Sequence, residues 1–218
     1  MKDVKIKFIL ASIFVFVFLL DLNAQIKIRV KGGLNFGTAT LNPEPVGLDI
    51  EHRIATVVGI GIEYSLENIA VQFEILYSMK GTIIEYERIL GSYSPIKEKI
   101  TSKVDYLEIP LSLKYYIPIE GSIIPFIFTG ASISFLISSK EITETEESTK
   151  ETDMKDYTNN TDFGIIVGAG TNINLGSGII VIDARYNFGV TDINNWSLRI
   201  FETKLQTIQL CIGYYFNL

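Results

Sequence analysis

The chain has 218 residues and a formal net charge of −6, with 25 acidic residues against 19 lysines and arginines. This length suits one domain, and the acidic balance argues against nucleic-acid binding, which depends on basic surfaces that neutralise phosphates. Cys211 is the only cysteine, which excludes an internal disulfide and a Cys-x-x-Cys redox pair. Hydrophobic residues make up 47% of the chain, yet no apolar run beyond residue 24 approaches the roughly 20 residues of a membrane helix. Any membrane contact must therefore come from strands.

The first 24 residues have the pattern of a secretory signal peptide. Lys2, Lys5 and Lys7 precede an uncharged apolar run at 8–20, and small Ala24 lies at the expected cleavage edge. The run is too short to span a bilayer as a helix. We therefore expect residues 1–24 to be a cleaved signal peptide, with a retained N-terminal anchor helix as the alternative.

Beyond residue 24, apolar residues recur at every second position, which is the period of a half-buried β-strand. The alternation predicts eight strands, at 25–36, 54–64, 69–80, 104–115, 124–137, 163–175, 179–189 and 204–218. Pro110 cannot donate a hydrogen bond to a neighbouring strand, so we expect a local irregularity there. Both parities are apolar in the fifth strand, where we assign to the outer face Ile127, Thr129, Ala131, Ile133 and Phe135.

The last strand needs an apolar environment on one of its faces, because from Ile208 onward that face is wholly apolar or aromatic. Such a strand is not stable as a free tail in water. A closed barrel pairs every backbone group without leaving an edge, and its outer face can meet lipid. The sequence therefore predicts an all-β fold, an eight-stranded antiparallel up-and-down transmembrane β-barrel formed by residues 25–218.

The links between the predicted strands alternate in length. Long polar links follow the first, third, fifth and seventh strands, and short links follow the second, fourth and sixth. This alternation is typical of outer-membrane barrels, which have short periplasmic turns and long extracellular loops. We predict a loop at 38–53, which holds two prolines and His52. The link at 138–160 has seven acidic residues against three lysines, which predicts a mobile, solvated loop.

A soluble barrel of the lipocalin type is the alternative, and it would bury its apolar face inside. The other face of five predicted strands is charged, which instead favours apolar residues against lipid and charges inside. Aromatic residues of the apolar parity also gather near the strand ends, as at the two interfaces of a membrane. They are Tyr64, Tyr115 and Phe216 near the short turns, and Phe36, Tyr77, Phe163 and Phe188 nearer the long loops.

Ten charged residues are expected to face the lumen of this barrel. They are Lys27, Arg29, Lys31, Glu63, Glu74, Lys80, Glu108, Lys114, Asp183 and Arg185. An eight-stranded barrel is only just wide enough for its own side chains, and unpaired charges in a water-poor lumen are costly. We therefore expect these residues to pair across strands and to block the lumen. A proton relay or an ion path through the same residues is the alternative.

The chain offers few candidates for catalysis or metal binding. His52 is the only histidine, and no nucleophile motif lies near it, so we interpret it as a solvated loop histidine rather than part of a hydrolase centre. Cys211 falls on the inward face, where a packed thiol is expected. The acidic segment 141–156 lacks the spaced ligands and the fixed glycine of a calcium loop. The sequence predicts no catalytic residue, cofactor or metal site.

Several stretches of the chain resemble the PorT-like family of outer-membrane β-barrels, relatives of the small OmpA- and OmpX-type barrels. They are VKGGLNF at 30–36, FEILYSMKG at 73–81, DYLEIPL at 105–111, GAG at 168–170, DARY at 183–186 and GYYF at 213–216. The resemblance spans nearly all of the chain after residue 24 and implies export to the outer membrane of a bacterium with two membranes. The end also resembles the C-terminal signal read by the barrel-assembly machinery, although two residues follow Phe216.

These patterns lead to one functional hypothesis and two alternatives. The hypothesis is a non-enzymatic outer-membrane barrel with a salt-bridged lumen and long acidic extracellular loops for structural or surface-interaction roles. The name of the resembled family implies the first alternative, an accessory subunit of a secretion or transport machine, and the second is a narrow porin-like channel. The expected partners are outer-membrane lipid, the barrel-assembly machinery during insertion, and a protein at the extracellular loops.

Overall fold

The computed structural model describes residues 25–43, 47–88, 96–176, 178–195 and 201–217. The expected signal peptide, part of three expected loops and one residue of the expected turn at 176–178 lie outside these ranges. Within the described residues, no helix is long and apolar enough to cross a membrane.

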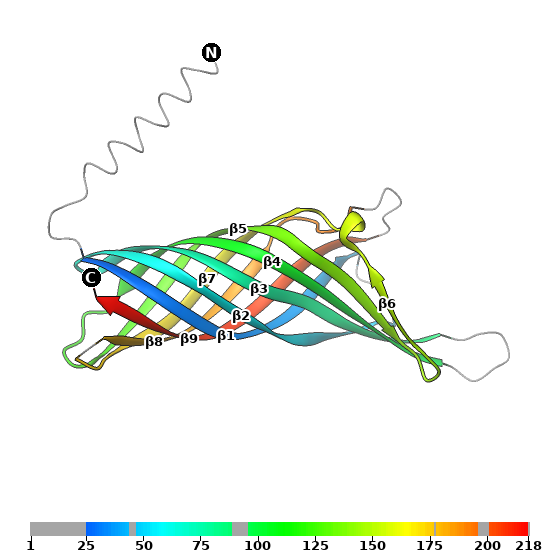
Figure 1. Ribbon diagram of the computed structural model, residues 1–218, viewed down its shortest axis with the longest axis horizontal. Helices are drawn as coiled ribbons and strands as arrows, with labels where there is room; N and C mark the ends of the chain where they lie inside the picture. Colours follow the sequence, from blue (N-terminus) through cyan, green and yellow to red (C-terminus); the bar gives the residue numbers. More distant parts are fainter. Residues whose placement is uncertain (1–24, 44–46, 89–95, 177, 196–200, 218) are drawn as a thin grey trace, which may run out of the picture.

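Eight long antiparallel strands of the described chain close into one barrel (Figure 1). They are β1 (Gln25–Asn42), β2 (Asp49–Leu66), β3 (Ile69–Arg88), β4 (Ile96–Tyr116), β5 (Ile123–Glu144), β7 (Thr161–Asn174), β8 (Ile179–Gly189) and β9 (Glu202–Asn217). Each strand pairs with its neighbours in the order β4-β3-β2-β1-β9-β8-β7-β5, and β4 also pairs with β5. Because β1 pairs with β9 and β4 pairs with β5, the sheet closes into a cylinder. The predicted eight-stranded barrel is confirmed.

The faces of the strands follow the alternation in the sequence. Ile212 on β9 is 58% exposed and its neighbour Cys211 is 4% exposed. In β5, whose two parities are both apolar, Ile127 is 53% exposed and Phe126 is 1% exposed, so the assigned facing of this strand is correct. The outer surface is therefore a continuous apolar belt, which water would not cover favourably and lipid does.

The strands extend further than the alternation predicted. β1 continues to Asn42 and β2 begins at Asp49, so the predicted loop at 38–53 is wrong in its bounds, and His52 lies on a strand. β3 likewise runs to Arg88, and β4 returns from Ile96. Beyond the apolar belt most residues on both faces of a strand are at least partly exposed, so the alternation ends there although the backbone pairing continues.

The link at 138–160 is not an irregular loop, which corrects the sequence-based expectation. β5 continues to Glu144, turns, and returns as β6 (Thr149–Asp153), which is followed by the short 3-10 helix η1 (Lys155–Tyr157). All five residues of β6 are exposed, so the segment is solvated as expected, but it is built as a hairpin. We call β3–β4 beyond residue 81 and β5–β6 beyond residue 137 the projecting hairpins (Figure 1).

The irregularity expected at Pro110 is present. The ladder between β3 and β4 is interrupted between the pairs Phe73–Leu111 and Leu76–Glu108, and the register is the same on both sides. Between β4 and β5 the register shifts after Asp105, where the projecting part of the hairpin begins. Pro110 therefore costs ladder bonds on one side only, because it keeps its pairing with Ser132 of β5.

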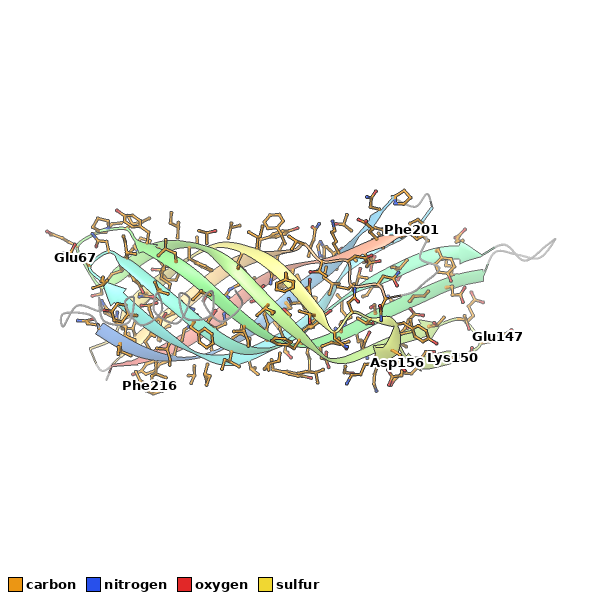
Figure 2. The ribbon with its side chains drawn as sticks, turned by 90° about the horizontal axis from the view of Figure 1, so that it is seen from above. Glu67, Glu147, Lys150, Asp156, Phe201 and Phe216 are labelled. Atoms are coloured by element: carbon orange, nitrogen blue, oxygen red, sulfur yellow. The ribbon has the colours of Figure 1, made fainter. Side chains whose placement is uncertain are left out.

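The two ends of the barrel differ in shape (Figure 2). Glu67, in the turn between β2 and β3, and Phe216, on β9, lie at the end with the short turns. Glu147, Lys150 and Asp156 lie at the other end, where the projecting hairpins extend past the barrel.

Candidate functional site in the barrel lumen

The structure places all ten of the predicted luminal charges inside the barrel, and each takes part in at least one ion pair. Nine of them are buried, and the side chain of Lys27 is 13% exposed. The pairs join strands that are far apart in the sequence, because a closed barrel brings every strand to the same lumen. The charges form three groups along the barrel.

The group nearest the short turns is centred on Glu63 of β2. Its carboxylate accepts hydrogen bonds from Lys114 Nζ at 2.6 Å, from the Ser65 hydroxyl at 3.0 Å, and from the hydroxyls of Tyr116 and Tyr215. Both carboxylate oxygens thus have two donors. This is the full satisfaction that a buried charge requires.

The ammonium of Lys114, like the carboxylate of Glu63, has several partners. Its ammonium lies 4.3 Å from the ring centre of Phe126, 5.5 Å from that of Tyr116 and 5.4 Å from that of Tyr215. The ammonium also donates a hydrogen bond to the Tyr215 hydroxyl at 3.0 Å. Three aromatic faces and one carboxylate therefore replace the water that the ammonium loses.

The middle group joins three cations to two carboxylates. Glu74 lies 3.0 Å from Lys31, 2.8 Å from Arg185 and 3.8 Å from Arg29. Asp183 pairs with Arg29 and, at 3.4 Å, with Arg185. Glu74 is therefore the residue on which this group depends most, since it contacts all three cations.

The third group lies toward the projecting hairpins and contains one cation and one carboxylate of the predicted set. Lys80 lies 2.9 Å from Glu108, and the Asn187 amide donates to the other oxygen of Glu108 at 2.8 Å. Asn187 also bonds to Ser132 at 3.1 Å. The group thus ties β3, β4, β5 and β8 together across the lumen.

Buried apolar clusters lie near both ends of the lumen. Toward the short turns, a buried cluster surrounds the Lys114–Glu63 pair and contains Ala70, Tyr116, Phe126, Phe128, Ile166, Val181 and Tyr215. Toward the projecting hairpins, a second cluster contains Ala39, Val104, Tyr106, Ile193 and Leu205. The charged groups therefore lie among and between two buried apolar clusters.

Glycines on the inner face provide the space for the large charged side chains. A Cβ atom added at Gly213 would lie 2.6 Å from Arg29 Nε and 2.8 Å from the Val30 carbonyl oxygen. At Gly61 it would lie 3.0 Å from Glu74 Cγ. The arginine and the glutamate of the middle group thus occupy volume that a larger residue opposite them would fill.

The other candidate residues do not assemble into a reactive centre. His52 is exposed on β2 opposite Thr82, whose hydroxyl donates to the Glu51 carbonyl at 3.2 Å. Cys211 is buried with Val57 and Leu76, as expected for a packed thiol. Across the described ranges, the His, Cys, Asp and Glu side chains form no group of three that could hold a metal ion.

Sequence reasoning missed the aromatic residues that complete the charged groups. Tyr116 and Tyr215 donate to Glu63, and Phe126 lies over Lys114, but no pattern in the sequence links these positions. For Tyr215, the sequence gives only one signal, which is that the residue lies on the inward-facing parity of the last strand. Which charge it would meet depends on the register of strands distant in the sequence.

Comparison with known proteins gives a family match and similar folds. A family model described as "Outer membrane protein beta-barrel domain" matches residues 23–195. No curated protein sequence matches the chain. Neisserial surface protein A is 14% identical, with 88% of this chain and 97% of that chain covered and a TM-score of 0.44. OprG of Pseudomonas aeruginosa is 14% identical, with 89% and 97% covered and a TM-score of 0.45. Ail of Yersinia pestis is 13% identical, with 88% and 99% covered and a TM-score of 0.38.

Proposed function

Because the chain belongs to the family of outer membrane protein beta-barrel domains, we propose that it is a non-enzymatic barrel with a closed lumen and a surface-interaction role. The protein lies in the outer membrane, where its apolar belt contacts lipid. The short turns face the periplasm and the projecting hairpins face the outside, as in other barrels of this kind. The hairpins are the part of the molecule that contacts external partners.

The enclosed ion pairs are the observation that carries the closed-lumen proposal. All ten charges are paired, and two apolar clusters lie near the ends of the lumen. An ion that entered would have to leave its hydration shell and displace a charge from its partner, which is unfavourable in a space this narrow. Closure of the lumen supports a structural or surface role over transport through the barrel.

Planar-bilayer recording with the pure protein tests the closed lumen. We expect a bilayer that contains the protein to conduct no more than a protein-free bilayer, apart from brief events. The comparison is the double variant Tyr106→Ala, Leu205→Ala. It removes two large side chains from the cluster near the hairpins and so makes the lumen easier to open. Steady conductance through the unaltered protein would overturn the proposal in favour of a narrow channel.

The surface role requires that the hairpins lie outside the cell. A cysteine at Glu147, in the turn between β5 and β6, should react with a membrane-impermeant maleimide added to intact cells. A cysteine at Glu67, at the opposite end, should react only after the outer membrane has been permeabilised. The native Cys211 is 4% exposed and should give little background. Labelling of Glu67→Cys alone in intact cells would reverse the orientation.

We also infer that the chain is a PorT-like member of its family and that the barrel-assembly machinery inserts it. The stretches at 73–81 and 105–111 support the first inference, and the outward aromatic Phe216 near the end of β9 supports the second. A secretion or transport machine is the other partner that this resemblance implies. Purification from cells in mild detergent tests it, because a stoichiometric partner that survives washing would favour an accessory subunit.

A further inference from the structure

The mouth of the barrel at the short-turn end is hollow. A cavity of about 1120 Å³ opens there, lined by the start of β1, the short turns and the strand ends beside them. Glu67 belongs to this lining and lies at the barrel end in Figure 2. The cavity lies on the opposite side of the molecule from the hairpins, so the proposed surface role makes no use of it.

Lys27 is the cation of this cavity, and it is poorly neutralised. Among the described residues its one ion pair is with Glu63, at 3.9 Å. Both oxygens of Glu63 are already occupied by Lys114, Ser65, Tyr116 and Tyr215. Lys27 lines the cavity, and its ammonium lies 5.9 Å from the ring centre of Tyr116, which lines the cavity as well. Among the described residues, no carboxylate lies closer to this ammonium than that of Glu63.

Asn172 supplies a second polar group to the cavity. It lines the cavity although the residue is only 3% exposed. Its carboxamide oxygen has no hydrogen-bond partner within the described part of the chain. A buried acceptor without a donor is costly. This oxygen is buried beside the cavity, and an N–H or O–H donor that reached it from the cavity would be favoured.

An apolar wall completes the cavity. Ile124 and Ile179 line it, and both are half-buried against the apolar cluster around Tyr116 and Phe126. A weakly paired cation, an unpartnered acceptor and an apolar wall together select one ligand chemistry. The ligand must carry an anionic group, an N–H donor close to it, and an apolar side chain.

We propose that this cavity binds a carboxylate-bearing peptide segment from the periplasm. The carboxylate pairs with the Lys27 ammonium, a peptide N–H donates to the Asn172 carboxamide oxygen, and an apolar side chain packs on Ile124 and Ile179. A peptide carboxyl terminus carries all three groups within one residue. A free fatty acid carries the carboxylate and the apolar chain but lacks the N–H donor.

Three small probes separate these requirements. N-acetyl-leucine has the carboxylate, the N–H and the apolar side chain, N-acetyl-leucinamide lacks the charge, and hexanoate lacks the N–H. Each is titrated into the full protein in lipid nanodiscs, with the isoleucine methyl groups isotopically labelled and followed by NMR. We expect N-acetyl-leucine to shift the methyl signals of Ile124 and Ile179 saturably and the amide to bind roughly tenfold more weakly.

Variants assign the binding to the two polar residues. Lys27→Met should weaken N-acetyl-leucine roughly tenfold, and Lys27→Arg should stay within about threefold of the unaltered protein. Asn172→Ala should weaken N-acetyl-leucine about fivefold and leave hexanoate unchanged. Lys150→Met, at the far end of the molecule, is the matched control and should change nothing.

The outcomes are decisive on the unaltered protein alone, even if Lys27→Met fails to fold. Equal binding of the acid and the amide, or a shift that never saturates, would overturn the site. Hexanoate that binds as tightly as N-acetyl-leucine would overturn the peptide part and identify a fatty-acid-like anion instead. If Lys150→Met weakened the binding of N-acetyl-leucine as much as Lys27→Met does, the effect would come from the net charge of the protein, which would also overturn the site. None of these readouts depends on which rim faces the periplasm.

Discussion

Two ion pairs of the same length lie in different environments, one in the lumen and the other on a projecting hairpin. Lys114 and Glu63 are 2.6 Å apart, and so are Lys140 and Glu151. The side chains of the first pair are 1% and 0% exposed, and those of the second are 48% and 52% exposed. Distance alone therefore says little about how much a pair contributes to stability.

The difference lies in what happens when a pair is broken. A luminal charge that loses its partner stays in a space with little water, so the remaining charge is costly. An exposed charge that loses its partner returns to water, and the change in stability is small. The lumen thus requires every partner to be present, whereas the hairpins tolerate loss. Four substitutions test this contrast.

Glu74→Gln should have the largest effect, because it leaves Arg29, Lys31 and Arg185 with one carboxylate between them. Breaking a buried charge group costs about 3–5 kcal/mol, and the upper part of that range is expected. Unfolding in urea, followed by the heat-modifiable mobility of the folded barrel, measures it. The control Ile182→Ala removes only lipid contact and should cost about 1 kcal/mol. Equal losses in the two variants would mean that the luminal charges are hydrated rather than enclosed.

Lys114→Met should come next, with a loss of about 3 kcal/mol, the lower end for a broken buried pair. Glu63 would keep the hydroxyl donors of Ser65, Tyr116 and Tyr215, which soften the loss. The same urea titration measures the change. A second variant, Lys114→Met with Glu63→Gln, should recover part of the stability, since it removes the stranded charge. No recovery would show that the aromatic contacts of Lys114 matter more than its charge.

Gly213→Ala should cost about 1–3 kcal/mol, because the new methyl group would press on Arg29 Nε and on the Val30 carbonyl oxygen. The matched control is Gly32→Ala on the outer face of β1, where the nearest atoms would lie at an ordinary 3.8 Å. That change should be neutral or slightly stabilising, since alanine restricts the unfolded chain. Similar losses at both positions would point to strand propensity rather than to crowding in the lumen.

Lys140→Met on the hairpin should have the smallest effect and leave the urea midpoint unchanged. The Lys140 ammonium bonds to Glu151 and holds the pKa of that carboxyl below its usual value. The pair is therefore intact above the ordinary carboxyl pKa and is lost as the pH falls through the lowered one. In the variant the pKa of Glu151, measured by NMR titration, should rise toward its usual value. The control Lys150→Met should leave the pKa of Glu151 unchanged. A lowered urea midpoint in Lys140→Met would show that the hairpin supports the barrel.

The sequence predicted the part of each strand that faces two different environments. Where lipid lies on one side and the lumen on the other, residues must alternate, and β8 was bounded correctly at 179–189. In the projecting parts of the strands most residues on both faces are at least partly exposed, so the hairpin of β5 and β6 has no clear alternation, and the sequence pattern wrongly predicts an irregular loop. Its backbone pairing is set by hydrogen bonds that leave no pattern in the side chains.

Alternation also identified the inward charges but not their partners. Arg29 pairs with Asp183, 154 residues away, and Glu74 pairs with Arg185, 111 residues away. Such pairs depend on how far neighbouring strands are staggered around the barrel, and that stagger accumulates over eight ladders. For the same reason the aromatic contacts of Lys114 could not be read from the chain in advance.

The pairing of β1 with β9 also determines when the molecule can be completed. β1 is made first and β9 last, yet they share a ladder that runs from Lys27–Asn217 to Asn42–Glu202. Until β9 reaches β1 the cylinder stays open, and the ion pair between Arg29 of β1 and Asp183 of β8 cannot be enclosed. The luminal charges can therefore be enclosed only once this ladder has formed. Contacts this distant in sequence make folding slow, so the unclosed chain is exposed to aggregation before its interior exists.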